Sequence, residues 1–210
     1  CKTIVMKNWY GFNMLWMYTT EGRKEFSPKD IQIEEKELDF ICDMGCNFIR
    51  LPIDYRFFVQ DFNYGNSNEK MLEVLDFCIE SIISRGLHCS LNIHRAPGYC
   101  INGAETERHN LWKDKEAQDE FVRLWKDFAI RYSNYTENQL SFDLLNEPPN
   151  INQYGMTRET HKSIMERVIS SIKSVDSKRT IIIDGLGGGN LAMPEMAKSG
   201  VIHSTRGYQP

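Results

Sequence analysis

The sequence predicts a parallel α/β fold of the (β/α)8 TIM barrel type, and three observations lead to this prediction. Short apolar segments alternate with amphipathic helical segments along the whole chain. The strand and helix units have roughly the unit length of a 250-residue eightfold barrel. Polar residues end several of the predicted strands, where such barrels carry their chemistry. We therefore expect residues 1–210 to form one barrel domain that contains the first six units and is incomplete at the C-terminus.

Composition and charge narrow the classes of protein that the sequence can represent. A chain of 210 residues with 41% hydrophobic content can bury a full core. Its formal net charge of -4 gives no electrostatic basis for a nucleic-acid partner. No apolar run approaches the length of a membrane span, and no charged and then apolar segment opens the chain as a signal peptide would. Because the first residue is Cys1 rather than Met, we expect a mature form or a fragment.

The six cysteines are predicted to be mostly reduced. Cys42 and Cys78 fall on apolar faces of predicted helices, and Cys89 falls within a predicted strand, which is typical of small buried hydrophobic residues. Their density is far below that of a secreted scaffold held together by disulfides. No histidine and cysteine spacing matches a zinc site.

The first part of the chain is predicted to contain two strands and one long helix. Residues 10–14 are typical of a short strand that ends at a polar residue. Residues 27–45 indicate a single helix, because a serine cap and a proline open it and a glycine ends it. Residues 48–53 form the second predicted strand, which carries Arg50 near its end.

The same alternation continues in the middle of the chain. An apolar helical stripe runs over residues 72–86, and residues 87–94 follow as a strand that ends in His94. The next helix begins after the capping residue Asp114 and turns its large apolar side chains inward. A further strand begins at Leu140.

Residues 140–150 combine a strand with an acid at its end. The segment begins with apolar alternation, and two prolines directly after Glu147 remove backbone donors and stop the strand. Glu147 is therefore predicted at the carboxyl end of a parallel strand, where α/β barrels place their chemistry. A solvated glutamate in a loop is the alternative for this residue on its own.

The last part of the chain is predicted to hold a helix from Thr157, a strand over residues 179–184, a short helix over residues 194–198 and a strand over residues 201–209. The glycine cluster at residues 185–190 does not fit a dinucleotide-binding fingerprint, because asparagine replaces its last glycine and it follows the fifth strand. A doubly wound sheet is the alternative architecture. Polar residues at several strand ends favour the barrel.

Four motifs in chain order carry a resemblance to a known family. They are Gly11-Phe12-Asn13, Asn47-Phe48-Ile49-Arg50-Leu51-Pro52, Leu91-Asn92-Ile93-His94 and Leu144-Leu145-Asn146-Glu147-Pro148. They resemble the first four strands of glycoside hydrolase family 5, the cellulase-like (β/α)8 barrels. Each motif is weak alone, and the four in this order make coincidence improbable.

The resemblance implies a role for each of four residues. Glu147 is the general acid/base, and Asn146 holds the sugar 2-hydroxyl. Arg50 supports the catalytic centre by orienting the nucleophile and keeping it ionised. His94 binds sugar hydroxyls or the nucleophile, and a histidine satisfied inside the barrel mouth is its alternative. No cofactor is implied, because a retaining glycosidase works with two carboxyl groups about 5 Å apart.

The sequence departs from the family pattern in two places. In the sixth strand Tyr208 matches, whereas Arg206 stands where the family usually has histidine, and we expect both to bind substrate. The family's nucleophilic glutamate lies on a seventh strand, so the proton donor is present here without the nucleophile. Asp184 is a candidate substitute for the nucleophile, although we expect it instead to form hydrogen bonds with the glycine loop. Asp143 is expected about 13 Å back along its strand from Glu147, too deep to reach the same glycosidic bond.

Aromatic residues near the strand ends complete the carbohydrate hypothesis. Trp16 follows the first strand, and Tyr99 and Trp112 lie on the long loop of residues 95–113. Each ring is expected either to stack on a sugar face or to serve as a packing anchor. The loop is long enough to form one wall of a cleft.

The sequence thus predicts a retaining hydrolase of β-1,4-linked glucan. Mannan, xyloglucan or a glycolipid glycan are alternative substrates, because loops decide the subsites. A catalytically inactive carbohydrate-binding relative, or a fragment that needs another chain, is the alternative function. Open sheet edges predict self-association or a complementing segment that closes the barrel, with self-association slightly favoured. The resemblance implies secretion or a cell-surface location, whereas the reduced cysteines indicate a cytoplasmic one. The sequence therefore does not decide the cellular compartment.

Overall fold

The computed structural model describes residues 8–20, 26–103 and 106–207, and the architecture of these residues is a single parallel sheet with helices between its strands. The six strands are β1 (Gly11–Asn13), β2 (Phe48–Asp54), β3 (His88–Arg95), β4 (Leu140–Asp143), β5 (Thr180–Asp184) and β6 (Ile202–Ser204). They pair in chain order, and every neighbouring pair is parallel. This order is that of a barrel, since a doubly wound sheet reverses its strand order at a switch point. The predicted succession of strands is confirmed.

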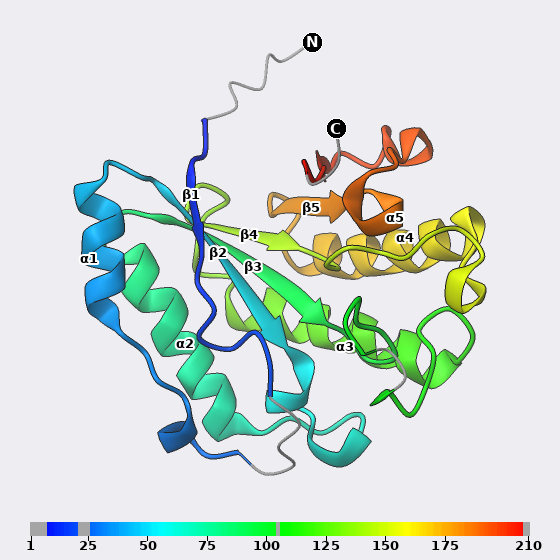
Figure 1. The fold of residues 1–210 in the computed structure, drawn as a ribbon, viewed down its shortest axis with the longest axis horizontal. Coiled ribbons are helices and arrows are strands. Elements are labelled where there is room, and N and C mark those ends of the chain that lie inside the picture. Colours follow the sequence, from blue (N-terminus) through cyan, green and yellow to red (C-terminus); the bar gives the residue numbers. More distant parts are fainter. Residues whose placement is uncertain (1–7, 21–25, 104–105, 208–210) are drawn as a thin grey trace.

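Four long helices connect the strands, and Figure 1 shows them following one another around the sheet in chain order. They are α1 (Glu35–Asp43), α2 (Glu69–Ile83), α3 (Lys115–Arg131) and α4 (Arg158–Val175). The shorter elements are α5 (Leu186–Gly189) and the 3-10 turns η1 (Pro28–Asp30), η2 (Tyr55–Phe57), η3 (Gln60–Phe62), η5 (Gln153–Gly155) and η6 (Pro194–Met196). Each long helix returns the chain to the start of the next parallel strand, which brings all the carboxyl ends to one side.

The single helix predicted over residues 27–45 is wrong, because the structure divides this segment. Ser27 and Asp30 form a reciprocal capping box, but it closes only the turn η1. Ile31 then takes an extended conformation, and α1 begins four residues later. Ile31 and Ile33 both pack against the core. Two apolar residues two positions apart share one side of an extended segment and lie on different sides of a helix, which explains the break.

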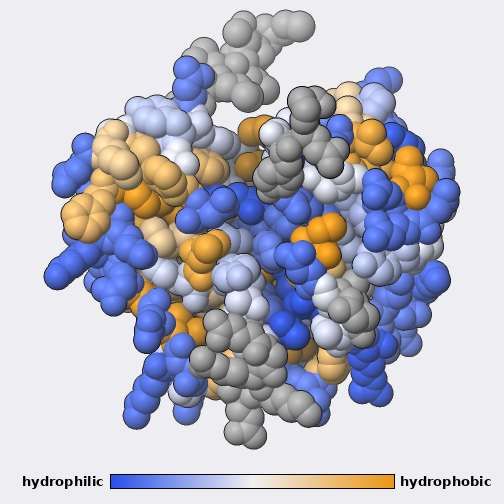
Figure 2. All heavy atoms as spheres, in the orientation of Figure 1, coloured by the Kyte–Doolittle hydropathy of each residue, from blue (hydrophilic) through white to orange (hydrophobic). Residues whose placement is uncertain are grey.

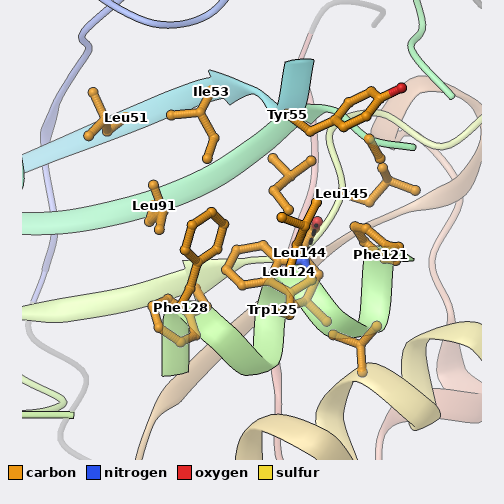
Figure 3. Close-up of a cluster of buried hydrophobic side chains, with 14 of the residues drawn as sticks. Leu51, Ile53, Tyr55, Leu91, Phe121, Leu124, Trp125, Phe128, Leu144 and Leu145 are labelled. Atoms are coloured by element: carbon orange, nitrogen blue, oxygen red, sulfur yellow. Dashed lines mark hydrogen bonds between the residues drawn. The ribbon is translucent and has the colours of Figure 1, made fainter. Parts of the chain in front are cut away.

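The core between the sheet and α3 fixes the backbone that leads into the site (Figure 3). Trp125 of α3 is fully buried, and its ring lies 5.1 Å from the Phe142 ring of β4, centroid to centroid. Its indole Nε1 also donates a hydrogen bond of 3.2 Å to the carbonyl oxygen of Leu144. One side chain therefore packs on the strand and satisfies a backbone acceptor just beyond its end, two residues before Asn146.

The described cysteines agree with the prediction of reduced thiols. Free cysteines stand at Cys42, Cys46, Cys78, Cys89 and Cys100, while Cys1 lies outside the described residues. Burial raises the pKa of the Cys78 thiol to about 12, so this thiol stays protonated at neutral pH. No helix in the described part of the chain combines the length and apolar character that crossing a bilayer requires.

We expect Thr157→Ala to lower the free energy of unfolding by about 1 kcal/mol, the usual value of a helix cap. The Thr157 side chain accepts a hydrogen bond from the Thr160 N–H at the start of α4. Chemical denaturation measures the change. Ser163→Ala, at an exposed position of the same helix, is the matched control and should change stability by less than about 0.5 kcal/mol. Equal effects of the two substitutions would contradict the capping role.

Candidate active site

Arg50, the third residue of β2 and not near its end as predicted, links β2 to the carboxyl ends of β1 and β4. From β2, its Nε donates to Asp143 Oδ2 of β4 at 2.7 Å, and its Nη2 donates to Asn146 Oδ1 at 2.9 Å. Its Nη1 reaches Asn13 Oδ1 at the end of β1 at 3.4 Å. A guanidinium suits this role because it is planar, always charged and offers donors in several directions. The motifs on the first, second and fourth predicted strands therefore meet at one cation.

Glu147 stands just beyond β4 in an unusual backbone conformation. Its φ is 45°, in the left-handed region that costs a residue with a side chain free energy. Two contacts hold the backbone there: the Glu147 N–H donates to Asp184 Oδ2 at 2.9 Å, and the Tyr99 hydroxyl donates to the Glu147 carbonyl oxygen at 2.7 Å. The side chain of Glu147 keeps 15% of its surface exposed. Glu147 is thus rigidly held and still accessible.

The glycine cluster after β5 supports the two prolines that follow Glu147. The N–H groups of Gly187 and Gly188 each donate at 2.9 Å, to the carbonyl oxygens of Pro149 and Pro148. Both glycines have positive φ values, 63° and 68°, which suit glycine and strain other residues. The cluster that does not fit a dinucleotide site is therefore used to fix the backbone beside Glu147.

Arg206 is the second cation of the site and reaches it from beyond β6. Its Nε donates to Glu147 Oε1 at 3.3 Å, and its Nη2 donates to Asp184 Oδ2 at 2.5 Å. Its Nη1 donates to Ser204 Oγ at 2.7 Å, and Nη2 also reaches Asn146 Oδ1 at 3.4 Å. Arg206 and Arg50 therefore share Asn146 as an acceptor.

Two aspartates lie beneath these cations and are almost inaccessible. Asp143 is 2% exposed and Asp184 is 1% exposed. Among the described residues, the Oδ1 atom of neither aspartate has a hydrogen-bond partner. Burial and the negative charge of Asp143 raise the pKa of Asp184 to about 6, although Arg206 opposes the rise. Asp184 therefore gains a proton more readily than an ordinary aspartate.

The structure corrects the extended strand assumed for Asp143 and the partner expected for Asp184. Asp143 was expected about 13 Å below Glu147 on one extended strand. The strand ends at Asp143, and the turn that follows brings Asn146 back onto the same guanidinium, that of Arg50. Asp184 was expected to bond with the glycine loop, whereas it accepts the N–H of Glu147.

His94 near the end of β3 completes the cluster. Burial and the positive charge of Arg50 lower its pKa, while Glu147 acts in the opposite direction. The imidazole is therefore neutral at pH 7, with one nitrogen able to donate and the other able to accept. The Tyr18 ring meets it edge to face with centroids 5.6 Å apart. In the described part of the chain, no group of three or more His, Cys, Asp or Glu side chains is arranged to hold a metal ion.

Two of the three predicted stacking rings are buried, which corrects that expectation. Tyr99 is 0% exposed and Trp112 is 4% exposed, and they pack edge to face with centroids 4.6 Å apart. Rings enclosed on this scale present no free face to a sugar, so both are packing anchors. The contribution of Tyr99 to the site is its hydroxyl group. The predicted substrate-binding Tyr208 lies outside the described residues.

Trp16 lies where a carbohydrate could reach it. It lines a hollow of about 570 Å³ together with Asn13, Tyr18 and other residues. Its indole Nε1 donates to Glu37 Oε2 at 3.0 Å, which fixes the ring plane. Asn13 contacts Arg50 and Tyr18 contacts His94, so the hollow adjoins the cluster. Its role in stacking on a sugar stays a prediction.

Sequence reasoning missed a second buried network behind the cluster. Arg95, at the end of β3, donates to Glu107 Oε1 at 2.8 Å and to the carbonyl oxygens of Asn102 and Gly103 at 2.7 and 3.1 Å. The Glu107 side chain is 0% exposed. These bonds hold the described part of the loop after β3 against the barrel. The only signal in the sequence was an arginine directly after His94.

Comparisons with known proteins agree on one family. The family model described as Cellulase (glycosyl hydrolase family 5) matches residues 3–203. Endoglucanase C of Acetivibrio thermocellus is 33% identical over 170 residues, which cover 81% of this chain and 46% of that protein. Cellodextrinase A of Ruminococcus flavefaciens is 34% identical over 132 residues, covering 63% and 38%. The chain thus spans about half the length, or less, of these relatives.

Solved structures show the same architecture. A crystal structure described as a glycoside hydrolase has a TM-score of 0.90 and 52% sequence identity, covering 97% of this chain and 61% of the other. Endoglucanase Cel5A from the hyperthermophilic Thermotoga maritima has a TM-score of 0.69 and 26% identity, covering 92% and 58%. The six parallel strands described here are therefore a half-barrel that matches part of a (β/α)8 barrel.

Proposed function

The chain belongs to glycosyl hydrolase family 5, the cellulase family, and we propose on this basis that it provides the acid/base half of a retaining β-1,4-glucan hydrolase. The observation that carries the proposal is the position of Glu147. It lies beyond the carboxyl end of β4, is fixed by two backbone hydrogen bonds and stands beside Asn146. An acid that must meet one glycosidic oxygen needs this rigidity, because misplacement by about 1 Å can cost 10²-fold in rate.

The proposed reaction runs in two steps. In the first, Glu147 gives its proton to the glycosidic oxygen as that bond breaks, while a second carboxylate attacks the anomeric carbon. In the second, Glu147 takes a proton from water, which displaces the enzyme carboxylate and regenerates both groups. Asn146 is proposed to hold the sugar 2-hydroxyl. Neutral His94 suits hydrogen bonds to other sugar hydroxyls.

The attacking carboxylate is proposed to come from a seventh strand rather than from the described residues. Asp143 is buried against Arg50, and Asp184 is buried against Arg206 and the Glu147 N–H. A carboxylate whose oxygens are occupied or enclosed in this way is a poor nucleophile. Arg50 is then available to orient the incoming carboxylate, as its family position implies.

Glucan is the proposed substrate class, because the relatives compared above are an endoglucanase and a cellodextrinase. The hollow beside Trp16 is proposed as a sugar-binding subsite, since an indole ring of fixed plane offers a face for stacking. Mannan is the main alternative. A solved structure of Thermotoga maritima Cel5A, 25% identical to this chain, is described in complex with mannotriose.

The edges of the half-barrel are proposed to be covered by a second copy of the chain or by a complementing segment. The residues of β1 are exposed along its length, with Phe12 50% exposed. Phe40 of α1 and Met44, which directly follows this helix, are 66% and 60% exposed. Figure 2 shows hydrophobic atoms gathered where Figure 1 places α1. Open parallel strands and apolar helix faces are normally covered.

We expect the 210-residue chain to bind cello-oligosaccharides with little or no hydrolysis, and to associate in solution. Calorimetric titration with cellohexaose measures binding, chromatography of the products measures hydrolysis, and light scattering measures the mass. A monodisperse monomer would contradict the association. Robust hydrolysis that disappears in Asp184→Asn would show that Asp184, and not a seventh-strand residue, attacks the sugar. Failure to bind any oligosaccharide would contradict the substrate class.

A further inference from the structure

Arg206, Asp184 and Glu147 form a closed ring of hydrogen bonds. The Glu147 N–H donates to Asp184 Oδ2, the same Oδ2 accepts from Arg206 Nη2, and Arg206 Nε donates back to Glu147 Oε1. The main chain of the proton donor and its carboxyl group are therefore both held through one aspartate and one arginine. This ring joins β5 and β6 to the segment after β4.

Arg206 occupies an enclosed site in the structure and does not simply lie on the surface. Arg206 N–H donates to the Gly189 carbonyl oxygen at 3.1 Å, and a Cβ atom on Gly189 would come within 2.5 Å of Arg206 Cγ. The absence of a side chain at this glycine thus admits the arginine stem. The side chains of Arg206 and Asp184 are 15% and 0% exposed, and a pair this enclosed is screened far less than a surface pair.

We propose that Arg206, held by Asp184, is a positioning residue that orients the Glu147 carboxyl group and balances the charge around it. This assignment replaces the substrate-binding role expected from the residue's place in the family motif. Its catalytic meaning rests on the proposed function, because it matters for turnover only if Glu147 exchanges protons with a glycosidic oxygen. The positioning itself is a property of the three residues.

Opposite charges explain why the two partners are found together. Arg206 alone would favour the ionised form of Glu147, which cannot donate a proton. The carboxylate of Asp184 offsets this cation, so Arg206 can orient Glu147 with a smaller effect on its protonation. Removing the cation should therefore raise the pKa of Glu147, and removing the Asp184 charge should lower it.

Other charged or titratable groups around Glu147 are the same in every variant. His94 on β3 and Tyr99 on the following loop interact with Glu147 directly. Arg50 on β2 and Asp54 at its end act on His94, and Asp143 on β4 acts on Asp184. Because these groups do not change, the difference between variants reports the ring. Opposite shifts of the Glu147 pKa in Arg206→Met and Asp184→Asn indicate that the two charges balance each other. If the two residues served only the fold, the two substitutions would not shift this pKa in opposite directions.

The test is an NMR titration of the 210-residue chain with ¹³C-labelled glutamate carboxyl groups. Glu147→Gln identifies the Glu147 signal by its loss. We expect Arg206→Met to raise the pKa of Glu147 by about one unit. We expect Asp184→Asn to lower it by a smaller amount, because the raised pKa of Asp184 leaves this group only partly ionised over the acid part of the titration. Arg85→Met is the matched control, because Arg85 also pairs with two carboxylates, Glu35 and Asp39, but lies between α2 and the start of β3. It should leave the Glu147 signal unchanged.

Arg206→Lys separates charge from shape. It retains the cation and loses the forked geometry, so the pKa of Glu147 should stay within about half a unit of the original. If Arg206→Met does not fold, as judged by circular dichroism, Asp184→Asn and Arg206→Lys decide the matter. No fall in Asp184→Asn, or shifts of the same sign in Asp184→Asn and Arg206→Met, would overturn the proposal.

The titration needs no substrate, so its outcome is separate from that of the proposed function. If the chain showed the two opposite shifts but neither bound nor cleaved glucan, the positioning role of Arg206 would be supported and the proposed function would be contradicted. A form that cleaves glucan should in addition show the basic limb of its kcat/KM profile moving with the measured pKa of Glu147. A basic limb that stays fixed in both variants would show that the ring does not act on catalysis.

Discussion

Glu147→Gln is expected to lower the turnover of unactivated glucan by about 10² to 10⁴ in the active form of this protein, the usual size of a general-acid contribution. Glutamine matches glutamate in shape, and the backbone bonds to Asp184 and Tyr99 do not involve the substituted group. The loss should therefore come from the missing proton and not from a displaced segment. Steady-state rates on soluble β-1,4-glucan measure it.

The leaving group provides an internal check on this first prediction. An aryl glycoside with a strongly acidic phenol needs little protonation, so its glycosylation step should be much less affected in Glu147→Gln. Glu195→Gln is the matched control, since this carboxylate pairs with Arg158 at 3.0 Å and should change no rate. Near-normal rates of Glu147→Gln on unactivated polysaccharide would show that another group donates the proton.

Much of the fold could be predicted because its signals are local. The strand and helix segments after residue 45 were recognised from apolar periodicity, and the structure contains each of these segments. The last strand is shorter than the predicted 201–209, because it ends at Ser204. The segment before α1 was predicted wrongly, because the capping residues Ser27 and Asp30 are equally suited to one isolated turn. Only the core decides that Ile31 and Ile33 both face inward, and no local pattern reports this.

The candidate site could be predicted as a set of residues but not as a set of contacts. The motifs named Arg50, Asn146, Glu147 and His94, and the structure brings these four together. The ring around Arg206 could not be foreseen, because it requires the left-handed backbone at Glu147 and the pairing of β5 with β6. Both are properties of the folded sheet.

Burial explains the remaining errors at the site. Tyr99 and Trp112 are residue types that often stack on sugars, yet their rings pack against each other. An aromatic residue in a loop has the same sequence signal whether it faces a ligand or the core. Asp143 was dismissed by a distance along an extended strand, and the strand ends at that residue. The turn that follows a strand therefore determines which side chains meet at its end, and the apolar pattern of the strand does not predict that turn.

Arg50→Ala is expected to reduce turnover strongly and also to reduce stability, in amounts that a second substitution separates. Arg50 donates to Asp143, whose side chain is 3% exposed, and losing the cation leaves a carboxylate enclosed without its partner. Removing one member of a buried pair typically costs about 3 to 5 kcal/mol. Chemical denaturation should register this loss as a cooperative transition at lower denaturant.

The double variant Arg50→Ala with Asp143→Asn separates the two effects of Arg50. The neutral amide has no charge to compensate, so a large part of the lost stability should return. Turnover should not return, because Asn146 still lacks its 2.9 Å donor and an incoming nucleophile still lacks its orienting cation. Recovery of both stability and turnover in the double variant would show that Arg50 serves only to neutralise Asp143.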